Sequence, residues 1–314
     1  MTTTVAELRA AGDLRLVREE LSCQPDQLLI KIEACGICAA DLEQFRLGPG
    51  SGVLRLGHEP VGRVLEVGAR VNDFKVGDRI TGFFAAACAT YALASPSRVL
   101  KVPNDLPPEE LLGEPLAAAV YAARACGHRF GDAIALVGCS FTGLMTLGAL
   151  ASKSAEALIA IDQEERLLSF AHDVGATHTI NCKKLDARQQ VMALTNGRGV
   201  ELAIYAGARP HMLQLAGSLL RAPEARLALL AWQPGPQEID LSLWKTGALV
   251  VNAHPDYSLH LMEDLRRGLS ALSRGALPLP RLITHKFNLK EIDKAFRLAS
   301  ERKDGYVKGV IYPE

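Results

Sequence analysis

Short apolar runs recur along the middle of the chain. Residues 133–137 and 157–161 are uninterrupted by charged side chains, and further runs follow at 202–205, 226–230 and 248–251. Runs of this length without polar alternation are typical of strands buried on both faces of a parallel sheet. Their spacing leaves room for a helix between successive strands, so the pattern predicts a doubly wound parallel α/β sheet.

The two ends of the chain have a different pattern. Residues 27–34 and 63–68 are strand-like, and residues 75–80 form a turn that leads into another strand. Near the C-terminus, two apolar stripes at helical spacing predict packed helices, and residues 306–311 predict a last strand. The stripes are Met262, Leu265, Leu269 and Leu272, and Ile292, Ala295, Phe296 and Ala299.

A glycine-rich turn separates the first two apolar runs. Gly138 ends the first run, Gly143 follows, and Asp162 ends the second run 24 positions after Gly138. The order strand, glycine turn, helix, strand, acid is that of a dinucleotide-binding Rossmann unit, in which N–H groups of the helix N-terminus bind the pyrophosphate. Ser140 replaces the middle glycine, so its Cβ weakens binding of the phosphates or its hydroxyl donates to them.

Asp162 indicates which dinucleotide binds. A carboxylate here accepts from a free ribose 2′-hydroxyl and repels a 2′-phosphate, which favours NAD over NADP. Arg166 is near enough in sequence to leave NADP open. The alternative role of Asp162 is a helix N-cap.

Composition and charge exclude several classes of protein. The 314 residues suffice for two domains, and the formal net charge is +0, which argues against nucleic acid or an anionic membrane as a partner. No apolar run reaches the roughly 18 residues that span a bilayer. The first residues lack the features of a signal peptide, so we expect a cytoplasmic protein. Seven scattered cysteines argue against a disulfide framework.

Side chains of the kinds that bind zinc lie at three places. Cys38 offers a thiolate, His58 and Glu59 offer an imidazole and a carboxylate, and Glu114 offers a second carboxylate. Three protein ligands would leave a fourth position open, which is typical of a catalytic zinc ion. Cys35 and Cys38 also form a C-x-x-C pair, and a redox dithiol is the less favoured interpretation.

With these motifs, residues 36–41, 57–62 and 113–116, the chain resembles the zinc-containing medium-chain dehydrogenase/reductase family. That family includes alcohol, sorbitol and threonine dehydrogenases. The resemblance runs from about Leu28 to the C-terminus.

The resemblance implies a discontinuous, β-rich GroES-like catalytic domain and a Rossmann NAD-binding domain. The first would comprise residues 1–115 and 254–314, the second residues 116–253, and the active site would lie in the cleft between them. Residues 249–251 would be the edge strand through which family members pair, which predicts a homodimer, with a tetramer as the alternative.

The resemblance also implies roles for the site residues. Cys38 and His58 would bind zinc, and Glu59 or Glu114 would complete the set, with Glu59 favoured. Asp41 would orient His58. Zinc would act as a Lewis acid on a bound alcohol whose hydride passes to the nicotinamide. The expected cofactors are NAD(H) and one catalytic zinc ion. The expected cofactor-binding residues are Gly138, Ser140, Phe141, Thr142, Gly143, Asp162, Ala206, Gly207, Leu230 and Trp232.

Two departures from the family pattern bear on metal content and reaction. Relatives with a structural zinc ion carry four closely spaced cysteines, whereas Cys88 is the only cysteine between Gly77 and Pro103, so no structural zinc is expected. Ala40 stands where alcohol-oxidising relatives have the Ser or Thr that relays the substrate proton.

The favoured function is therefore NAD-dependent oxidation of a secondary alcohol on a small polyol, sugar or cyclitol-like substrate. The alternatives are a reductase of a C=N or conjugated C=C bond and a non-redox ligand-binding module.

Overall fold

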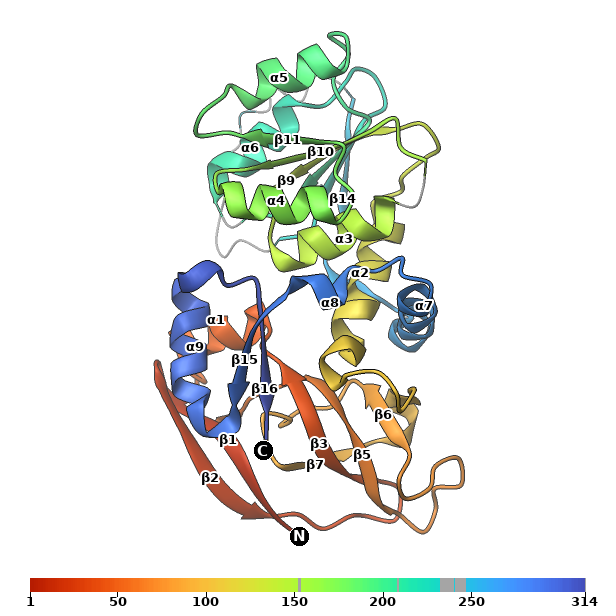
Figure 1. Cartoon of the computed structure of the whole chain (residues 1–314), viewed down its shortest axis with the longest axis vertical. Helices are drawn as coiled ribbons and strands as arrows, with labels where there is room; N and C mark the ends of the chain where they lie inside the picture. Colours follow the sequence, from red (N-terminus) through yellow and green to blue (C-terminus); the bar gives the residue numbers. More distant parts are fainter. Residues whose placement is uncertain (152–153, 208, 232–239, 241–246, 314) are drawn as a thin grey trace. The chain divides into compact units, whose positions relative to one another are not determined.

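The computed structural model describes residues 1–151, 154–207, 209–231, 240 and 247–313. They form two compact units, Met1–Pro115 with Leu279–Glu314, and Leu116–Pro278 (Figure 1). The chain passes from the first unit to the second after Pro115 and returns to the first at Leu279, and the residues just before Leu279 pack within the second unit. There, Gly268 lies so close to Leu116 that a Cβ on the glycine would be 2.9 Å from the Leu116 carbonyl carbon.

The first unit is β-rich. A seven-stranded sheet has the order β15-β16-β3-β5-β6-β8, with β7 also paired to β3, and a smaller sheet has the order β2-β1-β4. The strands are β1 Thr2–Ala10, β2 Asp13–Glu20, β3 Leu28–Gly36, β4 Leu54–Arg55, β5 Glu59–Val67, β6 Arg79–Gly82, β7 Tyr91–Ala94, β8 Val99–Lys101, β15 Ile283–Asn288 and β16 Lys308–Tyr312. The helices are α1 Ala39–Leu47, α8 Leu279–Leu282 and α9 Ile292–Glu301.

Helix α9 covers the core of the first unit with the apolar stripe that the sequence predicted. Ile292, Ala295, Phe296 and Ala299 are all buried. The ring of Phe296 meets Phe45 of α1 edge to face, with 5.6 Å between ring centroids, an arrangement that adds to the free energy gained by burial.

The second unit is a doubly wound sheet of six parallel strands in the order β11-β10-β9-β12-β13-β14. The strands are β9 Ala133–Val137, β10 Ala157–Asp162, β11 His178–Asn181, β12 Leu202–Tyr205, β13 Arg226–Leu229 and β14 Leu249–Asn252. The helices are α2 Gly113–Ala125, which begins in the first unit, α3 Phe141–Ala151, α4 Glu165–Asp173, α5 Ala187–Leu194, α6 Pro210–Ser218 and α7 Leu261–Ser273. This strand order is that of the dinucleotide-binding Rossmann fold.

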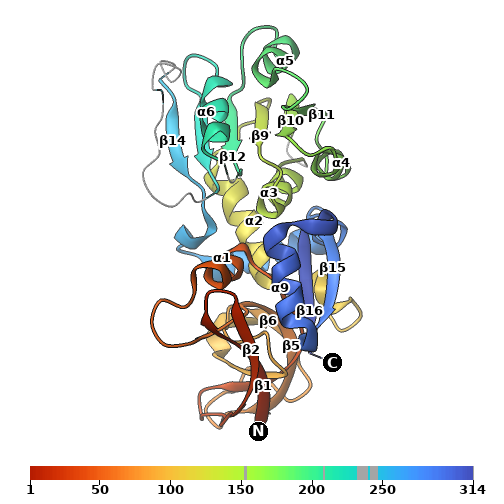
Figure 2. The same ribbon diagram turned by 90° about the vertical axis from the view of Figure 1, so that its left-hand side faces the viewer.

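The helices cover both faces of this sheet, as Figures 1 and 2 show. Helices α5 and α6 pack on one face with alternate residues of β9 and β10, and α3 and α4 lie on the other face (Figure 1). Burial on both faces explains why these strands are uninterrupted apolar runs. None of the described helices is both long enough and apolar enough to cross a membrane.

Candidate active site

Strand pairing in the first unit brings Cys38, His58 and Glu59 together. Glu59, the first residue of β5, lies directly opposite Gly36 at the end of β3. The chain leaves β3 and enters α1 at Cys38, which is the N-cap of that helix. One potential ligand atom from each of the three side chains lies within 4.8 Å of the other two.

The imidazole of His58 is oriented by Asp41. This aspartate lies in the first turn of α1, is buried, and has its Oδ1 3.3 Å from His58 Nδ1. Nε2 is then the ring nitrogen left for a metal ion. Burial disfavours the imidazolium, but hydrogen bonds with Asp41 and Cys38 outweigh it and raise the pKa of His58 above its ordinary value.

The Cys38 thiol is held in its neutral form when no cation is near. Burial raises its pKa to about 11. A hydrogen bond with His58 opposes this rise, and the charges of Glu59 and Glu114 add to it. A divalent cation would instead lower the pKa of Cys38, because it stabilises the thiolate directly.

A lysine that the sequence analysis did not single out completes the surroundings of Glu59. Lys308 opens β16, and its Nζ lies 2.6 Å from Glu59 Oε1. Both side chains are buried, with 3% and 1% of their area exposed. Burial lowers the pKa of Lys308, but the charges of Glu59 and Cys38 outweigh it and raise the pKa above its usual range. The sequence feature that could have identified Lys308 is its position inside the apolar run at residues 306–311.

The second oxygen of the Glu59 carboxylate fits a bound cation. Oε2 is buried and has no hydrogen-bond partner among the residues that the structure describes. It occupies space that a side chain at Gly36 would fill, since a Cβ there would be 2.0 Å from Oε2. A buried acceptor without a partner is destabilising, and a metal ion would satisfy it. With the Cys38 sulfur and the His58 nitrogen, this oxygen completes a donor set that fits zinc.

Glu114 lies outside this three-residue group. It is half-buried in the first turn of α2. It is near enough for its charge to contribute, after burial and Glu59, to the raised pKa of Cys38. The geometry therefore favours Glu59 over Glu114 as the third ligand.

The glycine turn of the second unit is closely packed against the end of β12. Gly138 has a φ of +93°, and a Cβ on it would be 2.4 Å from the Cα of Gly207. A Cβ on Gly143 would be 2.8 Å from the Cβ of Ala206. The predicted cofactor residues Gly138, Gly143, Ala206 and Gly207 are thus brought together by the pairing of β9 with β12.

Ser140 caps helix α3, whose first two residues are Phe141 and Thr142. Its Oγ accepts a hydrogen bond of 3.2 Å from the Gly143 N–H. This satisfies one of the free N–H groups of the first turn. The serine thus has a structural role at the point where a glycine would let a phosphate approach the backbone.

Asp162 ties the glycine turn to the end of β10. Its Oδ2 accepts from the Cys139 N–H at 2.7 Å, and its Oδ1 accepts from the N–H groups of Gln163 at 2.7 Å and Glu164 at 3.0 Å. The N-cap of α4 is Glu164, so Asp162 is not the cap of that helix. It lies at the strand end where the Rossmann acid is expected.

The last two predicted cofactor residues differ in what the structure shows. Leu230 follows β13, is buried, and donates its backbone N–H to the Tyr205 carbonyl. Trp232 lies outside the described residues.

Comparisons with known proteins agree with this architecture. Residues 24–129 match the alcohol dehydrogenase GroES-like domain, and residues 142–252 match the zinc-binding dehydrogenase domain. The chain is 28% identical to sorbitol dehydrogenase from Bacillus subtilis, over 100% of this chain and 99% of the relative. It is 29% identical to L-threonine 3-dehydrogenase from Pyrococcus furiosus, over 90% of each. The crystal structure of an Escherichia coli oxidoreductase/dehydrogenase of unknown specificity superposes with a TM-score of 0.90 at 25% identity, over 99% of both chains.

Proposed function

The chain belongs to the zinc-type, alcohol dehydrogenase-like family of medium-chain dehydrogenases, and from that premise we propose that it transfers a hydride between NAD(H) and a secondary alcohol or ketone. The proposed substrate is a polyol, sugar or cyclitol-like molecule. The observation that carries the proposal is the convergence of Cys38, His58 and Glu59, with one buried Glu59 oxygen left without a hydrogen bond. The polyol dehydrogenase among the relatives supports the substrate class.

Each site residue of the first unit has a distinct role in this proposal. When bound, zinc supplies Lewis acidity and the nicotinamide supplies the hydride chemistry. Cys38, His58 and Glu59 hold the metal. Asp41 fixes the ring of His58, and Lys308 neutralises and fixes one oxygen of Glu59.

The proton of the alcohol must leave by a route that does not use residue 40. Ala40 is exposed in the first turn of α1 and has no hydroxyl. Glu59 is committed to Lys308, whereas Glu114 lies close to Cys38 but outside the metal-ligand group. We therefore assign the general base to Glu114.

The second unit would bind the cofactor. The glycine turn and the N-terminus of α3 face the pyrophosphate in this proposal, and Asp162 selects NAD by accepting from the adenosine ribose. We further propose one catalytic zinc ion and no structural zinc in each chain, residence in the cytoplasm, and a homodimer, with a tetramer as the alternative.

Metal analysis of protein purified without added zinc tests the central claim. We expect about one zinc ion per chain, as for a single site. Cys38→Ser should lose most of the metal, whereas Cys35→Ser changes a buried thiol outside the ligand group and should retain it. Well under one equivalent in the unmodified protein, with no activity restored by zinc, would refute the proposal.

Substrate assays separate this reaction from its main competitor. The missing hydroxyl at Ala40 is the observation that favours a reductase of C=N or conjugated C=C bonds. We expect oxidation of polyols or reduction of their ketones, followed by NADH absorbance, and a higher rate for Ala40→Ser. Turnover of enones or imines alone, with no gain in Ala40→Ser, would favour the reductase. No NADH binding in a fluorescence titration would favour the non-redox module.

A further inference from the structure

Two cysteines meet in the core of the first unit. Cys35 lies near the end of β3, and Cys88 lies in the segment between β6 and β7. Both side chains are fully buried, and their sulfur atoms are 4.0 Å apart. A disulfide bond is about 2.05 Å long, so the two sulfurs would have to approach each other by roughly 2 Å to form one.

Hydrogen bonds hold the two thiols beside each other. The Cys88 S–H donates to the Cys35 sulfur at 4.0 Å, and the Cys35 S–H donates to the Gly36 carbonyl at 3.6 Å. The backbone of Cys88 is fixed on both sides. Its N–H donates to the Leu56 carbonyl at 3.1 Å, and its carbonyl accepts from the Ala6 N–H at 2.9 Å. The two sulfurs are therefore kept close together without a covalent bond.

Each cysteine is next to a segment that carries a proposed metal ligand. Cys35 precedes Cys38 by three positions along the chain. The Cys88 sulfur packs against Gly57, since a Cβ on that glycine would lie 2.8 Å from it, and Gly57 immediately precedes His58. A closer approach of the two sulfurs therefore displaces the backbone that carries both ligands.

We propose that Cys35 and Cys88 form a disulfide bond under oxidising conditions, and that this bond weakens zinc binding by Cys38 and His58. Hydrogen peroxide is a sufficient oxidant. It converts one thiol to a sulfenic acid and releases water, and the other thiol then displaces the sulfenic oxygen as a second water molecule. Two S–H bonds and the O–O bond break, one S–S bond forms, and the two electrons go to the peroxide. The disulfide itself is independent of the proposed function, whereas its effect on zinc rests on it.

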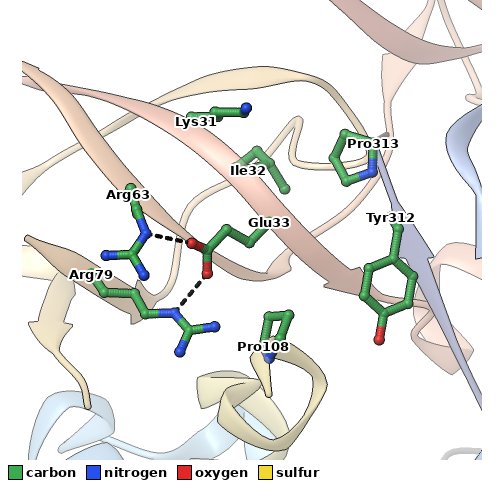
Figure 3. Close-up of a pocket in the computed structure, with 8 residues that line it drawn as sticks. All are labelled: Lys31, Ile32, Glu33, Arg63, Arg79, Pro108, Tyr312 and Pro313. Atoms are coloured by element: carbon green, nitrogen blue, oxygen red, sulfur yellow. Dashed lines mark hydrogen bonds and ion pairs between the residues drawn. The ribbon is translucent and has the colours of Figure 1, made fainter. Parts of the chain in front are cut away.

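The closed structure protects the two thiols from rapid oxidation. The hydrogen bond with Cys35, followed by burial, raises the pKa of Cys88 well above its ordinary value, and the thiolate is the reactive form. The pocket beside β3 has no cysteine in its wall, so it gives an oxidant no path to the pair (Figure 3). Oxidation therefore requires part of the unit to open locally.

The segment just before Cys88 is suited to open. Ala85 is exposed, and Ala86 is half-buried with a φ of +57°, a conformation that is unfavourable for a residue other than glycine. This strain lowers the free energy needed to open the segment. Bound zinc would oppose opening, because it would fix the two ligand-carrying segments in their closed arrangement. The pair should therefore oxidise faster in metal-free protein than in zinc-loaded protein.

Peptide mapping of the full-length protein tests the disulfide. Metal-free and zinc-loaded samples are treated with hydrogen peroxide and then unfolded in an alkylating agent. Trypsin places Cys35 and Cys38 in one peptide and Cys88 in another, so the proposed disulfide joins two peptides. We expect this cross-link in both samples, forming faster in the metal-free one. Cys88→Ala should abolish it. Cys126→Ala is the matched control and should keep it, because Cys126 is equally buried but lies in the second unit.

The zinc dissociation constant, measured by competition with a chelating dye, tests the coupling. We expect the oxidised protein to bind zinc at least about tenfold more weakly than the reduced protein, and dithiothreitol to restore the affinity. Cys88→Ala, treated with peroxide in parallel, shows the effect of oxidising Cys38 alone and should retain more of its affinity.

Three results would overturn the proposal. They are the absence of a Cys35–Cys88 cross-link in metal-free protein, a disulfide between Cys35 and Cys38 in its place, and an equal loss of zinc affinity in the unmodified protein and Cys88→Ala. If the reduced protein bound no zinc, the proposed function and the coupling would both be rejected. The peptide map would still decide whether the disulfide forms.

Discussion

The two oxygens of the Glu59 carboxylate have different partners. Oε1 is paired with Lys308, while Oε2 is buried without a hydrogen bond. Taking two charges out of water is costly, and the ion pair offsets this cost only while both partners are present. A metal ion at Oε2 would add a second compensation. Lys308 therefore positions Glu59 and also stabilises the folded protein when no metal is bound.

Lys308→Met tests this role. In metal-free protein we expect the free energy of unfolding to fall by about 3 kcal/mol, because Glu59 would be left as an unpaired buried charge. Zinc should recover part of the loss, since the metal supplies positive charge to the same carboxylate. Urea unfolding with and without zinc measures both effects.

Lys286→Met is the matched control for that experiment. Lys286 is also paired with a carboxylate, that of Glu109, but its side chain is 59% exposed. Its removal should cost less than about 1 kcal/mol, with no dependence on zinc. Equal losses in the two variants would contradict the assigned role of Lys308.

At the scale of elements, the N-terminus of α3 combines two demands. The first turn needs a cap, which the Ser140 hydroxyl supplies to the Gly143 N–H. A dinucleotide needs the same N–H groups and room for its phosphates. The Ser140 hydroxyl provides the cap, but the same side chain reduces the space for the phosphates.

Substitution of Ser140 separates the two demands. Ser140→Gly should bind NADH more tightly, because the Cβ and the competing acceptor are both gone, and should lose only a few tenths of a kcal/mol of stability. Ser140→Ala should lose about 1 kcal/mol, because it removes the cap, with a smaller gain in affinity. Fluorescence titration with NADH and urea unfolding measure the two quantities. Tighter binding by the unmodified protein than by Ser140→Gly would instead show that the hydroxyl donates to the phosphates.

Five of the six strands of the second unit could be predicted from sequence to within about one residue, whereas β11, which carries the polar residues His178 and Asn181, was not predicted. The apolar runs at 133–137, 157–161 and 202–205 correspond to β9, β10 and β12. Burial on both faces makes such strands uniformly apolar, so their limits are visible in composition alone. The helical stripe of α9 was visible for a related reason, because one face meets the core and the other meets solvent.

The pairing of distant side chains could not be predicted in the same way. Lys308 and Glu59 are 249 positions apart and meet because β3 pairs with both β16 and β5. Nothing local to either residue encodes that register. The donor types at Cys38, His58 and Glu59 were visible in the motifs, whereas the choice between Glu59 and Glu114 required their spatial arrangement.

At the scale of the whole molecule, side-chain packing joins distant parts of the chain within one unit. Helix α7 packs beside α2 in the second unit, where Arg124 donates to the buried Asp264. A buried carboxylate needs such a partner, and this one is supplied within the second unit. The limits of the catalytic domain that the resemblance implies, residues 1–115 and 254–314, stay a prediction.

The predicted assembly can be tested on the edge strand β14. This strand ends the six-stranded sheet, and in a single chain Leu249 and Val250 are 62% and 50% exposed. An apolar edge strand with unpaired backbone groups is prone to aggregate unless another chain covers it. We expect light scattering to show a dimer. Val250→Lys should give a monomer, because a charged side chain would have to be buried at the centre of the strand pair.

Val76→Lys is the control for the same experiment. Val76 is 63% exposed but lies in the turn between β5 and β6 of the first unit, outside any strand. The same change there adds the same charge and removes the same apolar side chain, so the dimer should persist. A monomeric unmodified protein at assay concentration would reject pairing through β14. Dissociation by Val76→Lys would show that the added charge alone, rather than the edge strand, controls assembly.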